Sequence, residues 1–127
     1  MLKNILLVAA GGSIGAVSRY LISVWASQKI GQSFPYGTLI ANVAGCFMIG
    51  AFMAIAVERL GISAQWRLFF TVGFVGGLTT FSSFSYETFK LVDEAGFHMA
   101  MANILANMAA GFFATWAGIS LGRLVPF

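Results

Sequence analysis

A polar stretch at residues 76–86, Gly-Gly-Leu-Thr-Thr-Phe-Ser-Ser-Phe-Ser-Tyr, contains the side chains whose types and spacing could do chemistry. It combines hydroxyl groups with two phenylalanines, inside a segment that is otherwise apolar enough to cross a membrane. Hydroxyl groups can donate hydrogen bonds to a small anion. Phe81 and Phe84 share one helix face, and the edge of an aromatic ring carries positive partial charge. The stretch therefore predicts a site for a small anion that is held without a fixed charge.

The same stretch is a poor helix former, because two glycines are followed directly by two β-branched threonines. We expect the helix to break over residues 76–80, in the middle of the membrane. Irregular backbone is tolerated at that depth only where it is buried in protein or lines an aqueous path. Free carbonyls around Gly76 and Thr79 would suit a hard monovalent cation, above all if two chains cross at their breaks. The break is therefore expected to be a functional site.

The composition indicates an all-α integral membrane protein. The chain has 127 residues, of which 59% are hydrophobic and 9% are charged, whereas soluble domains average about 25% charged residues. We expect a single transmembrane domain over residues 1–127. Its four helices are expected at residues 4–26, 36–57, 65–93 and 97–123, with the third one broken. The net charge of +3 comes from scattered basic residues that form no patch for nucleic acid.

The basic residues also bear on topology. Four helices put both termini on one side of the membrane. That side carries Lys3, Arg59, Arg67 and Arg123, and the other side carries Lys29 and Lys90, with Arg19 as a possible third. A nearly balanced count allows insertion in both orientations. We therefore expect an antiparallel, dual-topology homodimer, in which an ion path between chains is more economical than a pore through one thin bundle.

Further polar residues lie within the predicted helices. Arg19 either extends its charged end to the membrane surface or faces a water-filled vestibule, where it would attract anions. Asn42 either links helices by hydrogen bonds or offers N–H donors to a passing anion. Asn103, Asn107 and Thr115 form a polar stripe along the fourth helix. Helix packing alone is one explanation of that stripe, and the lining of a polar path is the other.

Other classes of protein fit the sequence less well. The chain has one histidine, one cysteine and no carboxylate pair at membrane depth, so we do not expect an enzyme. A small multidrug exporter of the four-helix type is the alternative function. Proton-coupled export of cations needs a carboxylate within the membrane, and the first helix has none. A scaffold that transports nothing would leave the polar stretch unexplained.

The string GGLTTFSSFSYE at residues 76–87 resembles that of the Fluc/CrcB family of fluoride channels. Support comes from Gly-Gly-Ser-Ile-Gly at residues 11–15 with Arg19, and from Gly-Thr-Leu at residues 37–39 with Asn42. The resemblance covers essentially the full length. It implies an antiparallel, dual-topology homodimer with two parallel pores. It also implies passive export of fluoride through the bacterial inner membrane, which protects cytoplasmic enzymes.

The resemblance implies a fluoride path lined by phenylalanine rings, one amide and a track of hydroxyl groups: Phe81, Phe84, Asn42, Ser83, Ser85 and Thr115. It further implies that Gly76 and Thr79 supply backbone carbonyls to a structural sodium ion (Na+) at the centre of the dimer interface. Arg19 would belong to the vestibule. Some family members carry a hydroxyl group where Gly111 stands here, so we expect a shorter polar track on the fourth helix.

Overall fold

The computed structural model describes residues 1–126, and within that part of the chain the regular structure is entirely helical. Four of its helical segments are long and apolar enough to cross a membrane: Leu2–Lys29, Tyr36–Val57, Ala64–Ala95 and Phe97–Leu124. The prediction of four spanning helices is therefore confirmed. The second and fourth segments begin where the sequence predicted, whereas the first is longer than expected at both ends.

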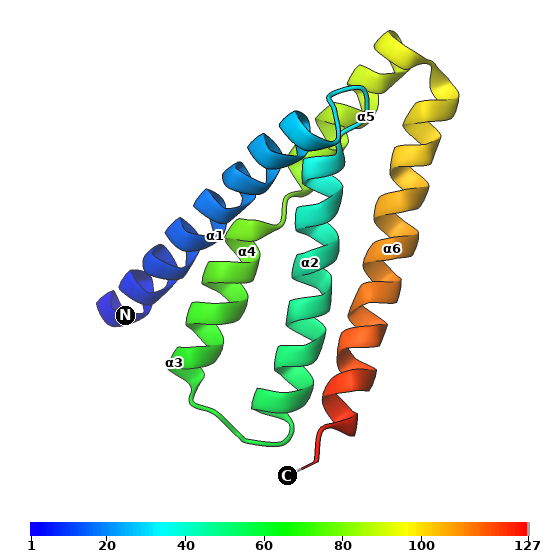
Figure 1. The fold of residues 1–127 in the computed structure, drawn as a ribbon. Coiled ribbons are helices and arrows are strands. Elements are labelled where there is room, and N and C mark those ends of the chain that lie inside the picture. The colour runs from blue at the N-terminus through cyan, green and yellow to red at the C-terminus, as the bar shows by residue number, and fades with distance from the viewer. Residues whose placement is uncertain (127) are drawn as a thin grey trace.

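The elements follow one another in the order α1 (Leu2–Lys29), α2 (Tyr36–Phe52), η1 (Met53–Val57), α3 (Ala64–Arg67), η2 (Leu68–Val75), α4 (Gly76–Leu78), α5 (Phe81–Ala95) and α6 (Phe97–Leu124). The segments η1 and η2 are π-helical: η1 continues α2, and η2 joins α3 to α4 without a turn. Both chain ends lie toward one end of the bundle, and the α1–α2 loop and the α5–α6 turn lie at the other (Figure 1). This arrangement is the one expected of a chain that crosses a bilayer four times.

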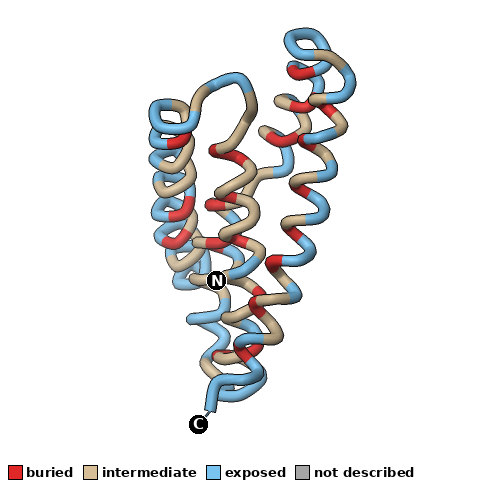
Figure 2. The backbone as a smooth tube through the Cα atoms, turned by 45° about the vertical axis from the view of Figure 1, so that its right-hand side comes forward, coloured by how far each residue is buried: buried red, intermediate tan, exposed pale blue. Residues whose placement is uncertain are grey.

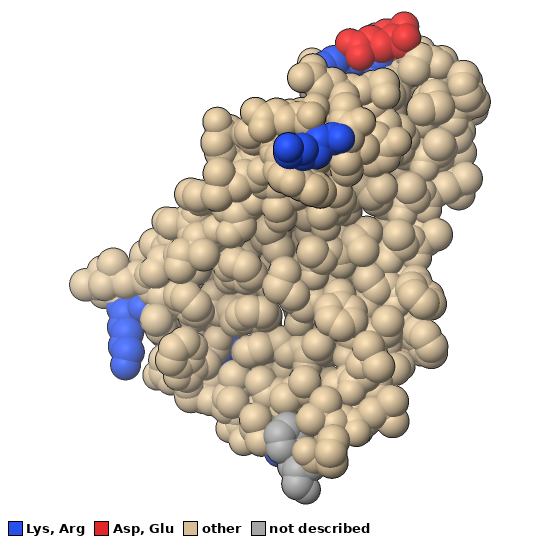
Figure 3. Space-filling model, viewed as in Figure 1, with Lys and Arg blue, Asp and Glu red and all other residues tan. Residues whose placement is uncertain are grey.

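The bundle has a thin core made mainly of small residues. Buried positions follow the inward faces of the helices, and the outward faces are exposed (Figure 2). Many of the exposed residues are large and apolar, as lipid contact requires. On the face drawn in Figure 3, charged side chains lie near the two ends and leave a broad uncharged middle. The surface thus has the layered polarity of a protein embedded in a bilayer.

Close packing between α1 and the segment formed by η2 and α4 depends on glycine. Gly11 and Gly15 are buried on one face of α1, at a spacing that lets two helices approach closely. A Cβ atom at Gly15 would overlap the carbonyl oxygen of Phe74, which belongs to η2. Arg19 follows Gly15 by four residues, so it lies on the same face and is directed toward α4.

A methyl group at Gly15, between α1 and η2, should therefore destabilise the bundle. We expect Gly15→Ala to lower the free energy of unfolding by about 1–3 kcal/mol, the usual effect of overpacking. Gly12→Ala is the matched control, because its Cβ would meet nothing closer than the Gly73 carbonyl oxygen at 3.8 Å. Alanine is also the better helix former, so the control should be neutral or stabilising. Denaturant unfolding in detergent micelles measures both variants, and equal losses would contradict the packing described here.

Candidate functional site

Two extended residues separate α4 from α5. Thr79 has φ −88° and ψ 156°, and Thr80 has φ −152° and ψ 120°. Neither pair of angles is helical. We call Thr79 and Thr80 the interruption. It lies beside α1 and α2 where these helices cross the third segment (Figure 1).

The sequence predicted irregular backbone over residues 76–80, and this was wrong for residues 76–78, which are helical. Gly76 and Gly77 are helical, because α4 continues directly from η2. Gly77 packs so closely on α1 that a Cβ atom there would come within 2.6 Å of the Gly12 carbonyl oxygen. Close packing between helices outweighs the weak helix propensity of glycine at this position.

Asn42 on α2 holds the interruption in place. Its side-chain oxygen accepts a hydrogen bond from the Thr80 N–H at 2.8 Å, and its Nδ2 donates to the Thr80 carbonyl at 3.2 Å. The same Nδ2 also donates to Asn107 Oδ1 on α6, at 3.2 Å. Since an amide group has two N–H hydrogens, both have acceptors here. Asn42 thus links helices, which is one of the two roles expected from the sequence, and donation to an anion stays a prediction.

The geometry of the interruption also redirects backbone donors. Thr80 Oγ1 accepts from the Ser83 N–H at 3.2 Å and so caps α5. In a continuous helix the Thr80 N–H would bond to the Gly76 carbonyl, and the Ser83 N–H to the Thr79 carbonyl. Both donors bond to side chains instead. The carbonyl oxygens of Gly76 and Thr79 lose these partners, and such oxygens are the ligands that hard cations prefer.

Arg19 binds the end of α4. Its Nε donates to the Gly77 carbonyl at 3.1 Å, and the side chain is half-buried. A positive charge is favourable at a helix C-terminus, where the carbonyl groups carry partial negative charge. In this structure the guanidinium therefore has a partner on the third segment, a contact that the sequence did not predict. Its role in a vestibule stays a prediction.

A groove of about 390 Å³ lies between α2, α6 and the interruption. Its walls include several of the predicted pore residues: Asn42, Phe81, Phe84 and Thr115. The rings of Phe81 and Phe84 meet edge to face, with centroids 5.6 Å apart and planes inclined by 72°. Phe84 is buried at 6% exposure, whereas Phe81 is 71% exposed. The two rings thus lie at the inside and the outside of one groove.

The three hydroxyl groups predicted for the fluoride path differ in their positions. Ser83 and Ser85 are half-buried on α5 and are not part of the groove walls. Thr115 Oγ1 donates to the Gly111 carbonyl at 3.1 Å, a bond within α6. The structure therefore brings together the two rings, the Asn42 amide and the Thr115 hydroxyl from three separate helices. Ser83 and Ser85 lie outside the groove walls, next to Phe84 in the sequence.

Known proteins resemble this chain along nearly its whole length. The family model described as CrcB-like protein, Camphor Resistance (CrcB), matches residues 6–119. A relative from Solibacter usitatus is 46% identical over 118 residues, which are 93% of this chain and 97% of the relative. A relative from Geobacter sulfurreducens is 45% identical over 122 residues, 96% of this chain and 98% of the relative. Both relatives are named fluoride-specific ion channel FluC.

This chain belongs to the CrcB-like family. A third relative, from Sulfurihydrogenibium sp., is 43% identical over 124 residues and is matched over its entire length. With its four spanning segments, this family member is a multi-pass membrane protein. The resemblance expected from the string at residues 76–87 is confirmed.

The sequence did not indicate Thr88, a residue of this CrcB-like chain that adjoins the site through Asn103. Asn103 on α6 is 1% exposed, and its Nδ2 donates to Thr88 Oγ1 on α5 at 2.9 Å. Thr88 is also buried, at 9% exposure. The polar stripe on the fourth helix indicated Asn103, but no pattern in the sequence indicated that its partner would be Thr88.

The cap on α5 gives a direct test of the interruption. Thr80→Val keeps the shape of the side chain but removes the acceptor for the Ser83 N–H. We expect it to lower the free energy of unfolding by about 1 kcal/mol, which is typical for a lost N-cap. Thr80→Ser keeps the hydroxyl group and should lose much less. Denaturant unfolding in micelles measures the difference, and two variants of equal stability would show that the cap contributes nothing.

Proposed function

We propose that this protein is a fluoride-selective channel, through which fluoride leaves the cytoplasm down its own gradient. Membership of the CrcB-like family and the printed names of its relatives support this function. The observation that carries it is the groove, where the Phe81 and Phe84 rings meet beside neutral polar groups. A channel moves an ion without changing it, so we assign no enzymatic reaction to the chain.

The chemistry of the groove suits an anion that must bind and then leave. Ring edges of Phe81 and Phe84 offer weak positive charge. The hydroxyls of Ser83 and Ser85, outside the groove walls, would offer hydrogen bonds, and Thr115 would do so when its bond to the Gly111 carbonyl opens. Neutral donors stabilise an anion less strongly than a fixed positive charge does, so the ion can move on. Asn42 would contribute an N–H only when one of its bonds to Thr80 or Asn107 opens.

The proposal includes a homodimer whose two chains run antiparallel through the bacterial inner membrane. The large exposed fraction of Phe81 supports it, because a second chain would cover this ring and close the groove. The nearly balanced basic residues at the two ends support insertion in both orientations. In this assembly the interruption lies at mid-membrane, the whole chain forms one transmembrane domain, and the dimer contains two pores.

We further propose a structural sodium ion where the interruptions of two chains meet. The redirected donors support it, because the Gly76 and Thr79 carbonyls lose their helical partners. Arg19 occupies the Gly77 carbonyl between them, and the Gly76 and Thr79 carbonyl oxygens of each chain would bind the cation. The bound ion would neutralise these oxygens and stabilise the dimer. Beyond this contact, Arg19 would keep the nearby vestibule positive and attract anions.

Fluoride efflux from liposomes tests the function. Wild-type protein should release fluoride well above the rate of empty vesicles, with sodium present. We expect Phe81→Ile and Phe84→Ile each to reduce the flux at least about tenfold, which corresponds to about 1.4 kcal/mol of barrier. The reason is that isoleucine fills similar space but has no ring edge.

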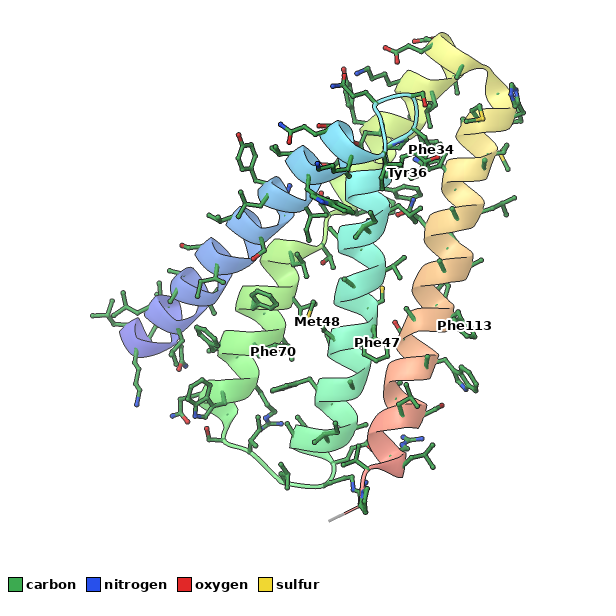
Figure 4. The ribbon with its side chains drawn as sticks, viewed as in Figure 1. Phe34, Tyr36, Phe47, Met48, Phe70 and Phe113 are labelled. Carbon is green, nitrogen blue, oxygen red and sulfur yellow. The ribbon has the colours of Figure 1, made fainter. Side chains whose placement is uncertain are left out.

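Phe113→Ile is the matched control for these variants. Phe113 points away from the bundle on α6 (Figure 4) and is 65% exposed, so its replacement should leave the flux unchanged. A wild-type rate equal to that of empty vesicles would refute the channel. Full flux in both ring variants would remove the role assigned to the rings.

Exchange of cations tests the sodium site. Purification with N-methylglucamine in place of sodium should lower the melting temperature of the dimer, because loss of a ligand bound only by the folded state destabilises it. Re-addition of sodium should restore the melting temperature in a concentration-dependent way. Choline serves as a second bulky cation. If the dimer melts alike in all three cations, the carbonyl site is wrong.

A further inference from the structure

Three asparagine side chains form a row across α2 and α6. Asn42 Nδ2 donates to Asn107 Oδ1 at 3.2 Å, and Asn107 Nδ2 donates to Asn103 Oδ1 at 3.0 Å. Asn107 Nδ2 also donates to the backbone carbonyl of Asn103 at 2.9 Å. Each amide therefore accepts through its oxygen on one side and donates through its nitrogen on the other.

Both ends of this row are on α5 or its cap. At one end the Thr80 N–H donates to Asn42 Oδ1 at 2.8 Å. At the other end Asn103 Nδ2 donates to Thr88 Oγ1 at 2.9 Å, and Thr88 Oγ1 donates to the Phe84 carbonyl at 2.7 Å. The result is a chain of five hydrogen bonds that leaves the start of α5, crosses two other helices and returns to α5 at the pore phenylalanine. We call it the amide chain.

The two ends fix the direction of the amide chain. A backbone N–H can only donate, and a backbone carbonyl can only accept. Thr80 therefore requires the oxygen of Asn42, and the Phe84 carbonyl requires the hydroxyl proton of Thr88. Between these ends each amide has one orientation that satisfies both neighbours, since a flipped amide would break two bonds at once.

Most side chains of the amide chain are buried, which makes the loss of any one of their hydrogen bonds costly. Asn103 is 1% exposed, and Thr88 and Asn107 are each 9% exposed. An amide left without a partner in such surroundings is costly, because no water can replace the lost bond. Asn103 and Thr88 are not part of the groove walls, so their contribution to the site must pass through the residues that they hold.

We propose that Asn103 and Thr88 are positioning residues of the fluoride path, an inference that rests on the function proposed above. Apolar packing would hold α5 against α6 but would allow small rotations about the helix axis. The amide chain fixes that rotation, because it ties the Thr80 peptide and the Phe84 carbonyl to the same row of amides. It thereby sets where the Phe84 ring stands relative to the interruption.

Paired substitutions at Thr88 test the proposal by fluoride efflux from liposomes. Thr88→Val has the same shape without the hydroxyl group, and we expect its flux to fall about tenfold. Thr88→Ser keeps the hydroxyl group and should retain nearly the wild-type flux. Thr71→Val is the matched control, because the Thr71 hydroxyl donates to the Arg67 carbonyl at 2.6 Å outside the amide chain, and its flux should not change.

A double variant tests whether the amide chain acts as one unit. Asn103→Leu should reduce the flux about as much as Thr88→Val, and the two together should reduce it no further, because either change already opens the chain. Losses that multiply would overturn the proposal. Only variants that elute with the wild-type size in detergent are compared, and Thr88→Ala replaces Thr88→Val if the latter does not.

Hydrogen exchange gives a readout that does not depend on transport. The Thr80 amide should exchange faster in Thr88→Val and Asn103→Leu than in the wild type or Thr88→Ser. This effect is expected although four hydrogen bonds of the amide chain separate Thr80 from Thr88. Wild-type liposomes without fluoride efflux would overturn the proposed function and the transport role with it. Efflux in the wild type that is unchanged in Thr88→Val and Asn103→Leu would overturn the positioning role alone.

Discussion

The pair of hydrogen bonds between Asn42 and the Thr80 peptide is the constraint on which the rest of the site depends. Backbone groups inside a bilayer must have partners within the protein. At Thr80 the N–H loses its helical partner, and the Asn42 side chain replaces it by accepting from the N–H. The same amide also donates to the Thr80 carbonyl, which as the N-cap of α5 accepts the first bond within that helix. Without such an acceptor on the facing helix, an extended residue here would leave the Thr80 N–H unsatisfied. The interruption therefore requires α2 to present an amide at this level.

The interruption also divides the third segment into two half-helices with opposite ends facing it. The C-terminal end of α4 carries partial negative charge, and Arg19 binds it through the Gly77 carbonyl. The N-terminal end of α5 carries partial positive charge, and the Phe81 and Phe84 rings follow directly from it. Arg19 thus binds the negative end of α4, and the proposed anion path starts at the positive end of α5. A continuous helix would offer neither end at this depth.

Much of the fold could be predicted from the sequence, because long apolar runs bounded by charged residues specify spanning helices almost by themselves. The local backbone was harder to predict. Weak helix propensity suggested an irregular Gly76 and Gly77, but both continue the helix from η2, and Gly77 packs tightly on α1. Arg19 was expected to reach the surface or a vestibule. Its true neighbour is a carbonyl group far away in the sequence, and spacing within one helix cannot indicate such a partner.

Spacing within one helix also cannot indicate the partners of the polar stripe on α6. Periodicity placed Asn103 and Asn107 on one face, and it left open whether that face packs against helices or lines a path. At Asn42 both N–H hydrogens already have acceptors, one in Thr80 and one in Asn107. An anion that approaches Asn42 must therefore compete with a protein oxygen, whereas the ring edges of Phe81 and Phe84 have no such competitor of comparable strength. Thr115 is occupied in the same way, because its Oγ1 donates to the Gly111 carbonyl. We therefore propose that the rings and the Ser83 and Ser85 hydroxyls would meet the anion in the resting geometry, and that the amides act first by holding α5 in position.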